Sequence, residues 1–265
     1  HVIADQMQTR ALPESLAGVV QELELRQPAV VTRALLTEIA STTGTQLPEK
    51  DLVDRLVRLG WLLPLRKRDA WEFAPAARAG RYASGDPWIE LRALLEHEPD
   101  APVAVAFDSA VWELGHSTHQ PTEPVLAHRR GWRPPEALDV RLVTFEWHLP
   151  SEMVRRLPVW REATVVVAAA ERPAAQGDWA NADDWLPETF RAVTADDVLA
   201  EAAGRKVSTL ARLGYLAEWS GRDDIGDEIE ALLPGRLPVI TLGPRDRRDR
   251  WSRRWHVYDA LLPQR

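Results

Sequence analysis

The chain has 265 residues, of which 45% are hydrophobic and 28% are charged. This length allows two compact domains or one domain with an appended module, and the composition predicts a soluble globular protein with a sizeable core. The chain has no cysteine, which excludes disulfides, thiolate metal sites and a cysteine nucleophile. No apolar run approaches the roughly 20 residues that span a bilayer, and the N-terminus lacks a secretion signal, so we expect a cytoplasmic protein without a membrane partner.

The net charge of −7 argues against a protein that coats nucleic acid over its whole surface. Residues 1–80 contain ten lysines and arginines and ten aspartates and glutamates, so the whole deficit lies after residue 80. Within the neutral part, Arg66, Lys67 and Arg68 are adjacent. A neutral unit whose cations are clustered can still bind DNA.

Three helices are predicted in the N-terminal part. The first runs from about Glu14 to Arg26, because apolar residues recur there at helical spacing. Thr32 is a suitable N-cap for a second helix that closes near Gly44. Pro48 opens a third helix and Gly60 ends it.

Two short strands are predicted directly after the third helix, at residues 61–65 and 70–74, and the turn between them reads RKRD. Three helices and a two-stranded ribbon within roughly 60 residues are the plan of a winged helix-turn-helix. The pattern therefore indicates a module that holds duplex DNA.

The chain after residue 75 has a different pattern. Residues 76–86 are small and polar and are predicted to be a linker. We therefore expect an α+β chain with a winged helix-turn-helix domain at 1–80 and a larger mixed α/β domain at 84–265. In the second domain, the predicted helices cover residues 88–98, 109–115, 163–170, 198–204, 208–220 and 225–233, and the predicted strands cover residues 103–107, 124–129, 139–147, 237–242 and 255–258.

The third helix is the candidate reader of the major groove. Its outward stripe contains Asp51, Asp54, Arg55 and Arg58, and Lys50 lies beside it. Arginine is suited to guanine edges or phosphates, whereas aspartate near phosphates is repelled. The alternative is a solvated face with the intrahelical ion pairs Asp51–Arg55 and Asp54–Arg58.

The basic turn is stronger evidence for DNA binding. The three cations Arg66, Lys67 and Arg68 repel one another at a hairpin tip, and a tip that reaches a phosphate backbone would have this composition. A solvated turn is the alternative.

A second basic cluster lies near the C-terminus, in the sequence GPRDRRDRWSRRW. Arginines beside a tryptophan suit nucleic acid or an acidic partner surface. The alternative, which we favour here, is a mobile loop between two terminal strands. The arginines of this candidate surface are Arg245, Arg247, Arg248, Arg250, Arg253 and Arg254.

The sequence contains no convincing catalytic motif, so we expect no enzyme activity, no metal and no cofactor. His116 and His119 are three residues apart, but no metalloprotease glutamate follows them and no third ligand is evident. The paired aspartates stand where helices begin, where capping explains them. The twelve tryptophans are expected mostly in the core.

Several motifs together resemble an actinobacterial member of the AbiEi antitoxin family, the transcriptional regulators of type IV toxin–antitoxin pairs. The resemblance covers nearly the whole chain. It is carried by Gly60-Trp61, by the strand at 70–75, and by the segments at 84–92, 109–115, 171–179, 210–218 and 255–258.

This resemblance implies a bacterial repressor whose winged helix binds inverted repeats in its own promoter, as a monomer in solution or paired on DNA. It also implies protection against a nucleotidyltransferase-like toxin. Carried over by position, the DNA-binding residues are Lys50, Arg55, Arg58, Arg66, Lys67 and Arg68. The chain departs from this expectation in the acidic residues of the third helix, which makes binding through paired copies the better hypothesis.

Two alternatives from other classes stay open at this point. Asp139 and Glu146 on one predicted strand suggest a winged helix fused to a nuclease-like domain, although the lysine that such a site needs is missing. Alternatively, the second domain is an interaction module that binds the toxin directly.

Overall fold

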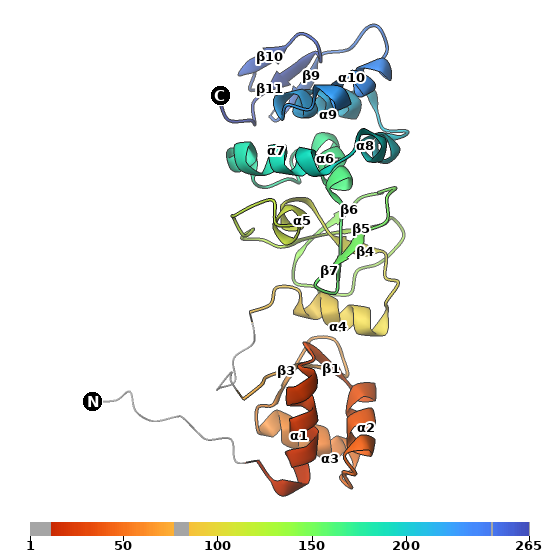
Figure 1. Cartoon of the computed structure of the whole chain (residues 1–265), viewed down its shortest axis with the longest axis vertical. Helices are drawn as coiled ribbons and strands as arrows, with labels where there is room; N and C mark the ends of the chain where they lie inside the picture. Colours follow the sequence, from red (N-terminus) through yellow and green to blue (C-terminus); the bar gives the residue numbers. More distant parts are fainter. Residues whose placement is uncertain (1–11, 77–84, 245, 265) are drawn as a thin grey trace, which may run out of the picture. The chain divides into compact units, whose positions relative to one another are not determined.

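The computed structural model describes residues 12–76, 85–244 and 246–264 (Figure 1). It is a mixed α+β structure in two compact units, one containing residues 1–101 with 135–139 and the other containing 102–134 with 140–265. The predicted linker lies almost wholly outside the described residues, so the expected boundaries at 80 and 84 stay a prediction. Within the described ranges, no helix has the length and apolarity that a bilayer span requires.

The first unit contains three helices, a small sheet and a fourth helix. The sheet has the order β1-β3-β2, and both pairings are antiparallel. The elements are α1 (Glu14–Arg26), β1 (Val30–Thr32), α2 (Arg33–Thr42), α3 (Glu49–Arg58), β2 (Leu62–Pro64), β3 (Ala70–Phe73) and α4 (Ile89–His97).

Side-chain and glycine caps fix the ends of α2 and α3. The Thr32 hydroxyl accepts a hydrogen bond from the Leu35 N–H at 3.3 Å, as an N-cap does. Gly60 adopts a φ of 75° after α3, and the Trp61 N–H donates to the Leu56 carbonyl at 2.9 Å. This is a Schellman motif, and it turns the chain directly from α3 into strand β2.

Strand β3 is buried on both faces. All four of its residues are buried, because one face packs on α1, α2 and α3 while α4 packs against the other. Phe73 belongs to the main core of the unit, whereas Ala70 packs with Ala93 of α4. Helix α4 therefore belongs to the first unit by its contacts, although the sequence pattern assigned its residues to the second domain.

The second unit is built around a five-stranded mixed sheet of order β6-β5-β4-β8-β7. A smaller sheet of order β10-β11-β9 lies near the C-terminus. The strands are β4 (Val103–Val105), β5 (Val125–His128), β6 (Arg141–Thr144), β7 (Glu152–Val154), β8 (Leu157–Val159), β9 (Ile240–Leu242), β10 (Arg250–Ser252) and β11 (Val257–Asp259). The helices are α5 (Phe107–Glu113), α6 (Glu162–Glu171), the 3-10 helix η1 (Trp179–Asn181), α7 (Ala182–Ala192), α8 (Ala195–Ala202), α9 (Val207–Trp219) and α10 (Asp223–Ala231).

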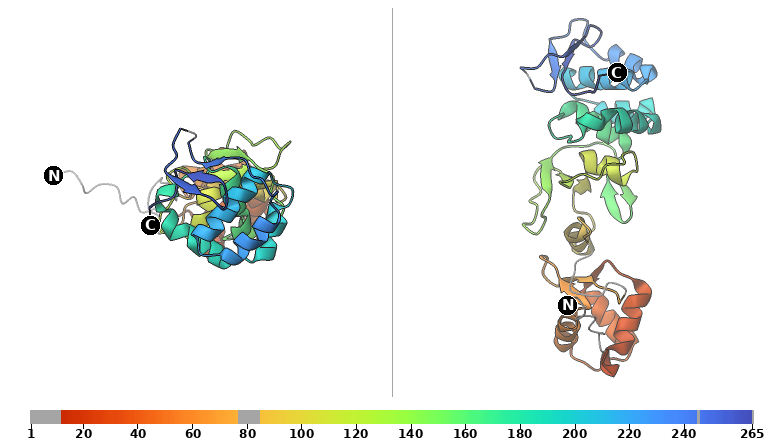
Figure 2. Two further views of the ribbon diagram at one scale, coloured as in Figure 1. Left: turned by 90° about the horizontal axis from the view of Figure 1, so that it is seen from above. Right: turned by 90° about the vertical axis from the view of Figure 1, so that its left-hand side faces the viewer.

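Helix α6 is the centre of this unit. Its residues from Ala163 to Ala170 are all buried, and it contacts α5, α7, α8 and α9. Figures 1 and 2 show α6, α7 and α8 as a layer between the five-stranded sheet and the helix pair α9–α10. A helix covered on all sides can be apolar all round, which explains its run of valines and alanines.

A buried ion pair joins this layer to the sheet. Glu201 of α8 is fully buried, and Arg205 donates to it at 2.9 Å. The carboxylate also accepts from the Thr164 hydroxyl of α6 and from the Leu149 N–H that follows β6. Both oxygens of this buried carboxylate therefore accept hydrogen bonds.

Three short parts of the sheets do not follow from the sequence pattern. Strand β1 and the hairpin β7–β8 were not predicted, and strand β10 lies in the segment that the sequence indicated as a loop. The strand expected at 139–147 is shorter, Arg141–Thr144. Eight of the twelve tryptophans are buried, which confirms their expected place in the core.

We predict that Gly214→Ala destabilises the protein. A Cβ on Gly214 in α9 would lie 2.2 Å from the Trp255 ring, and that ring is fully buried. Overpacking of this kind costs about 1–3 kcal/mol in the free energy of unfolding. Urea unfolding followed by tryptophan fluorescence measures the change.

Gly226→Ala in α10 is the matched control. A Cβ there would lie 3.5 Å from the same ring, which is an ordinary contact, and alanine favours a helix by up to about 1 kcal/mol over glycine. We therefore expect the control to be neutral or stabilising. Equal destabilisation by both substitutions would show that the close approach at Gly214 does not matter.

Candidate functional site

Helix α3 presents unpaired cations to solvent. Lys50, Arg55 and Arg58 are exposed, and none of them takes part in an ion pair within the described part of the chain. The intrahelical pairs that the sequence allows, from Asp51 and Asp54 to the arginines, are not among the ion pairs of the described residues. The arginines of α3 are thus not committed to neighbouring carboxylates.

Arg33 neutralises two acidic residues on this side of the unit. Its guanidinium contacts Glu49 of α3 at 2.7 Å and Asp69 of the hairpin turn at 2.6 Å. The hydrogen bond to Asp69 is the main cause that raises the pKa of Arg33 above its ordinary value. Because one side chain contacts both elements, the first turn of α3 and the turn between β2 and β3 lie next to each other.

The hairpin turn is held by acidic groups of the same unit. The Glu90 carboxylate of α4 accepts from the backbone N–H groups of Arg66 at 2.9 Å and Lys67 at 3.3 Å. The Arg66 side chain contacts Asp139 at 3.0 Å, and Lys67 Nζ lies 3.4 Å from Glu98.

Arg68 differs from its two neighbours in the turn. It is exposed and has no ion-pair partner among the residues that the structure describes. Together with the α3 cations, Arg68 is the part of the predicted set whose charge is fully available. The sequence could not indicate this division, because the acidic partners come from positions far along the chain.

The arginine-rich C-terminal segment is largely used within its own unit. Arg250 donates to the fully buried Asp259 at 2.7 Å. Arg254 contacts three acidic side chains of α9 and α10, and hydrogen bonds to Asp227 first and Glu230 second raise its pKa further above its ordinary value. Arg254 therefore holds the C-terminal segment to the helices, whereas Arg250 joins strands β10 and β11 of the small sheet.

The remaining arginines of this segment have mixed surroundings. Arg247 pairs with Asp249 at 2.6 Å, and the Arg248 guanidinium lies 5.1 Å from the centre of the Tyr258 ring. Arg253 is exposed and unpaired within the described ranges, and Arg245 lies outside them. The segment is thus not one continuous basic surface.

The histidines and acidic residues considered for catalysis do not form a metal site in the described residues. His116 contacts Glu162 at 2.9 Å, and His119 lies in an exposed loop where its N–H donates to Ser117. Asp139 and Glu146 both fall outside strand β6. The predicted strand at 139–147, which suggested a nuclease-like pair, is therefore too long.

Residues 103–219, from β4 to the end of α9, match the model of the AbiEi antitoxin C-terminal domain. The chain carries an AbiEi antitoxin C-terminal domain. This match confirms the resemblance that the sequence motifs indicated, and it supports an antitoxin role in a toxin–antitoxin pair.

A solved structure extends the likeness beyond the matched domain. The crystal structure of RV2827C protein from Mycobacterium tuberculosis is similar with a TM-score of 0.78 and 26% sequence identity. The likeness covers 95% of this chain and 93% of that one. A comparison with curated proteins finds no match.

We predict that the protein loses stability at acidic pH partly through Glu162. The hydrogen bond from His116 holds the pKa of Glu162 below its ordinary value, although burial opposes this. A lowered folded pKa contributes stability above the unfolded value of about 4.3, and this contribution disappears as the pH falls through the folded pKa. Melting temperatures recorded from about pH 7 down to pH 3 measure the loss.

His116→Asn is the informative variant, because it removes the imidazole that lowers this pKa. We expect its melting temperature to fall less steeply with acid than that of the wild type. His119→Asn, in the exposed loop, is the control and should follow the wild-type curve. Parallel curves for all three proteins would contradict the assignment.

Proposed function

We propose that the first unit is a winged helix-turn-helix that binds double-stranded DNA, and that the protein represses its own promoter. The support is the order α1-β1-α2-α3-β2-β3 together with the antiparallel pairing of β1, β3 and β2. In such modules the second helix of the helix-turn-helix enters the major groove and the hairpin contacts the adjacent backbone. Here these parts are α3 and the turn at residues 66–69.

The single observation that carries the proposal is the set of free cations on these two elements. Arg55 and Arg58 have the donor geometry for guanine edges or phosphates, and Lys50 and Arg68 suit phosphates. Arg33 supports them, because it neutralises Glu49 and Asp69, which would otherwise repel the DNA backbone.

Arg66 and Lys67 are proposed as secondary contacts. The Arg66–Asp139 pair is largely exposed, at 58% and 78%, and exposed ion pairs contribute about 0–1 kcal/mol. Arg66 can therefore exchange Asp139 for a phosphate at low cost. The same exchange is open to Lys67, although its side chain is more buried.

Binding through two copies on an inverted repeat follows from the acids that remain on α3. Asp51 and Asp54 are exposed and unpaired within the described residues, so they weaken the attraction of one copy for phosphates. Two copies on half-sites about one helical turn, ~34 Å, apart restore the affinity. We therefore propose that the protein is a monomer in solution and paired on DNA.

The second unit is proposed to provide protection against a co-expressed toxin. Its match to the antitoxin domain family supports a toxin partner. The resemblance found in the sequence points to a nucleotidyltransferase-like toxin, and co-purification with the product of the adjacent gene tests whether neutralisation uses direct contact.

Arg55→Ala and Arg58→Ala are predicted to weaken binding to the inverted repeat of the promoter. Loss of a base contact costs about 1–3 kcal/mol, whereas loss of a phosphate contact lowers the salt dependence of log K by about one unit. Fluorescence anisotropy at several salt concentrations separates the two roles. Arg236→Ala, which removes an exposed arginine of the second unit, should leave both quantities unchanged.

The absence of any binding to this DNA at low salt would refute the proposal. So would an affinity that does not change in the Arg55 and Arg58 variants. A single half-site should bind more weakly than the repeat. Equal affinities would refute the pairing of two copies on DNA but not DNA binding itself.

Within the hairpin turn, we predict that Arg68→Ala weakens DNA binding more than Arg66→Ala. Arg68 has no described carboxylate partner, whereas Arg66 must first leave Asp139. The same anisotropy titrations compare the two variants, and we expect the larger loss of salt dependence, about one unit, for Arg68. The reverse order would show that Asp139 orients Arg66 rather than competing for it.

A further inference from the structure

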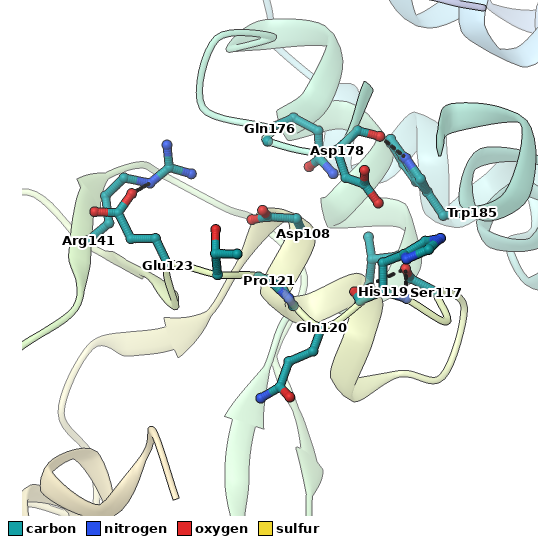
Figure 3. Close-up of a pocket in the computed structure, with 13 residues that line it drawn as sticks. Asp108, Ser117, His119, Gln120, Pro121, Glu123, Arg141, Gln176, Asp178 and Trp185 are labelled. Carbon is teal, nitrogen blue, oxygen red and sulfur yellow. Dashed lines mark hydrogen bonds and ion pairs between the residues drawn. The ribbon is translucent and has the colours of Figure 1, made fainter. Parts of the chain in front are cut away.

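A pocket of about 250 Å³ in the second unit has no role in the function proposed above. It lies between the start of α5, the loop before β5, the beginning of β6 and the segment that joins α6 to η1 (Figure 3). Three carboxylates line it, from Asp108, Glu123 and Asp178, against one guanidinium, from Arg141. Acceptor groups therefore exceed cationic donors.

Gln176 shows that this pocket is built for a ligand. Its side chain is only 3% exposed, yet neither the oxygen nor the nitrogen of its amide has a hydrogen-bond partner among the described residues. Figure 3 shows this amide beside the carboxylates of Asp108 and Asp178. A buried amide without partners is costly, so a native fold that retains one calls for a group that binds to it.

The buried position of Asp108 in the pocket disfavours the charged form of its carboxyl group. Burial raises its pKa above the usual range, the charge of Asp178 raises it further, and Arg141 opposes the shift. The preceding Phe107 adopts a left-handed φ of 52° and is fixed by its contacts with Phe145 and Trp160. The backbone thus places a carboxylate where it is poorly solvated and faces a second one.

The cation that is present does not satisfy these two aspartates. Arg141 donates to the Ala175 carbonyl at 2.5 Å and lies 3.6 Å from Glu123. No described side chain donates a hydrogen bond to Asp108, and Asp178 receives one only from the neutral amide of Asn181. Among the described residues, Asp108 accepts only from the backbone, with the Ser109 N–H at 3.2 Å. Two carboxylates and the Gln176 amide oxygen therefore keep capacity as acceptors, while the Gln176 amide nitrogen and Arg141 Nε lack acceptors in the described chain.

We propose that this pocket binds a guanidinium group. A guanidinium carries five N–H donors in one plane and a positive charge, which suits two carboxylates and an amide oxygen. The volume is below the ~300–1,000 Å³ of pockets for larger ligands, so the occupant is about the size of one arginine side chain. The lining does not group three metal-ligating side chains among the described residues, which favours an organic cation.

The guanidinium comes either from a small molecule or from an arginine of a partner protein. This proposal does not depend on DNA binding. The probe is L-argininamide, and its counterpart is L-citrullinamide, which has nearly the same shape but carries a neutral urea in place of the guanidinium. Titration of the full-length protein is followed by the indole N–H resonance of Trp185, which lines the pocket and donates to the Asp178 carbonyl at 2.8 Å. Loss of the resonance in Trp185→Phe assigns it.

We expect a saturable shift with L-argininamide and none with L-citrullinamide. Asp108→Asn should weaken binding by about tenfold or more, because it removes the buried charge that pairs with the cation. The variant should remain folded, since the raised pKa means that ionised Asp108 opposes folding at neutral pH. Asp183→Asn, an exposed carboxylate of α7 outside the pocket, should bind like the wild type.

Gly177→Ala tests the pocket without a change of charge. A Cβ at Gly177 would lie 2.6 Å from Oδ2 of Asp108, so the carboxylate must move. We expect at least a severalfold loss of affinity in this variant as well. Binding that survives both Asp108→Asn and Gly177→Ala would overturn the proposal.

Other results would also overturn it. Equal shifts with L-argininamide and L-citrullinamide would show that the guanidinium is not recognised, and no shift with either would show a pocket that holds only water. Saturable binding of adenosine or guanosine, but not of L-argininamide, would assign a nucleobase instead.

If the guanidinium belongs to a partner, the co-purified product of the adjacent gene blocks L-argininamide binding. If the guanidinium belongs to a small molecule, L-argininamide and the product of the adjacent gene bind together. Either result supports the site.

Discussion

The buried ion pair between Glu201 and Arg205 is the contact on which the antitoxin domain depends. A carboxylate without water is tolerated only when a cation and further donors replace its hydration. Arg205 also donates to Glu171, the last residue of α6, and to the Glu146 carbonyl after β6. One pair of side chains thus joins the sheet, the central helix α6 and helix α8. Removal of either partner would leave an uncompensated charge among apolar residues.

This constraint extends to the pocket beside it. The segment that carries Gln176 and Asp178 begins where α6 ends, and Arg205 fixes that end through Glu171 at 2.8 Å. The other wall begins at β4 and Phe107, whose ring packs on Trp160 directly before α6. The pocket is therefore made by two connections that leave the same rigid centre. Asp108 and Asp178 are thus positioned by the fold around them, which is the arrangement that a preformed binding site requires.

Local signals predicted the helices of the first unit and missed some of the strands, for physical reasons. Helix α1 follows the expected span because spacing and caps act within one element, and the same holds for Thr32 and Gly60. The hairpin β7–β8 turns through Arg155 and Arg156, both with positive φ, where asparagine and glycine are the usual signal. Helix α4 was assigned to the second domain because its partner strands, β1 and β3, lie on the other side of the predicted linker. For the candidate sites, residue type indicated the cations, but only tertiary contacts distinguish free from paired ones.

The distribution of paired and free arginines explains how an acidic protein could offer the DNA-binding surface proposed above. In the second unit, arginines such as Arg205, Arg250 and Arg254 are neutralised by carboxylates and serve the fold. In the first unit, Arg33 neutralises Glu49 and Asp69 beside the proposed interface, whereas Arg55 and Arg58 have no ion-pair partner in the described chain. Net charge sums over both kinds and therefore hides the difference. Screening shortens the reach of the distant acidic surface to about 8–10 Å at physiological salt, so a local cluster decides the attraction to a phosphate backbone.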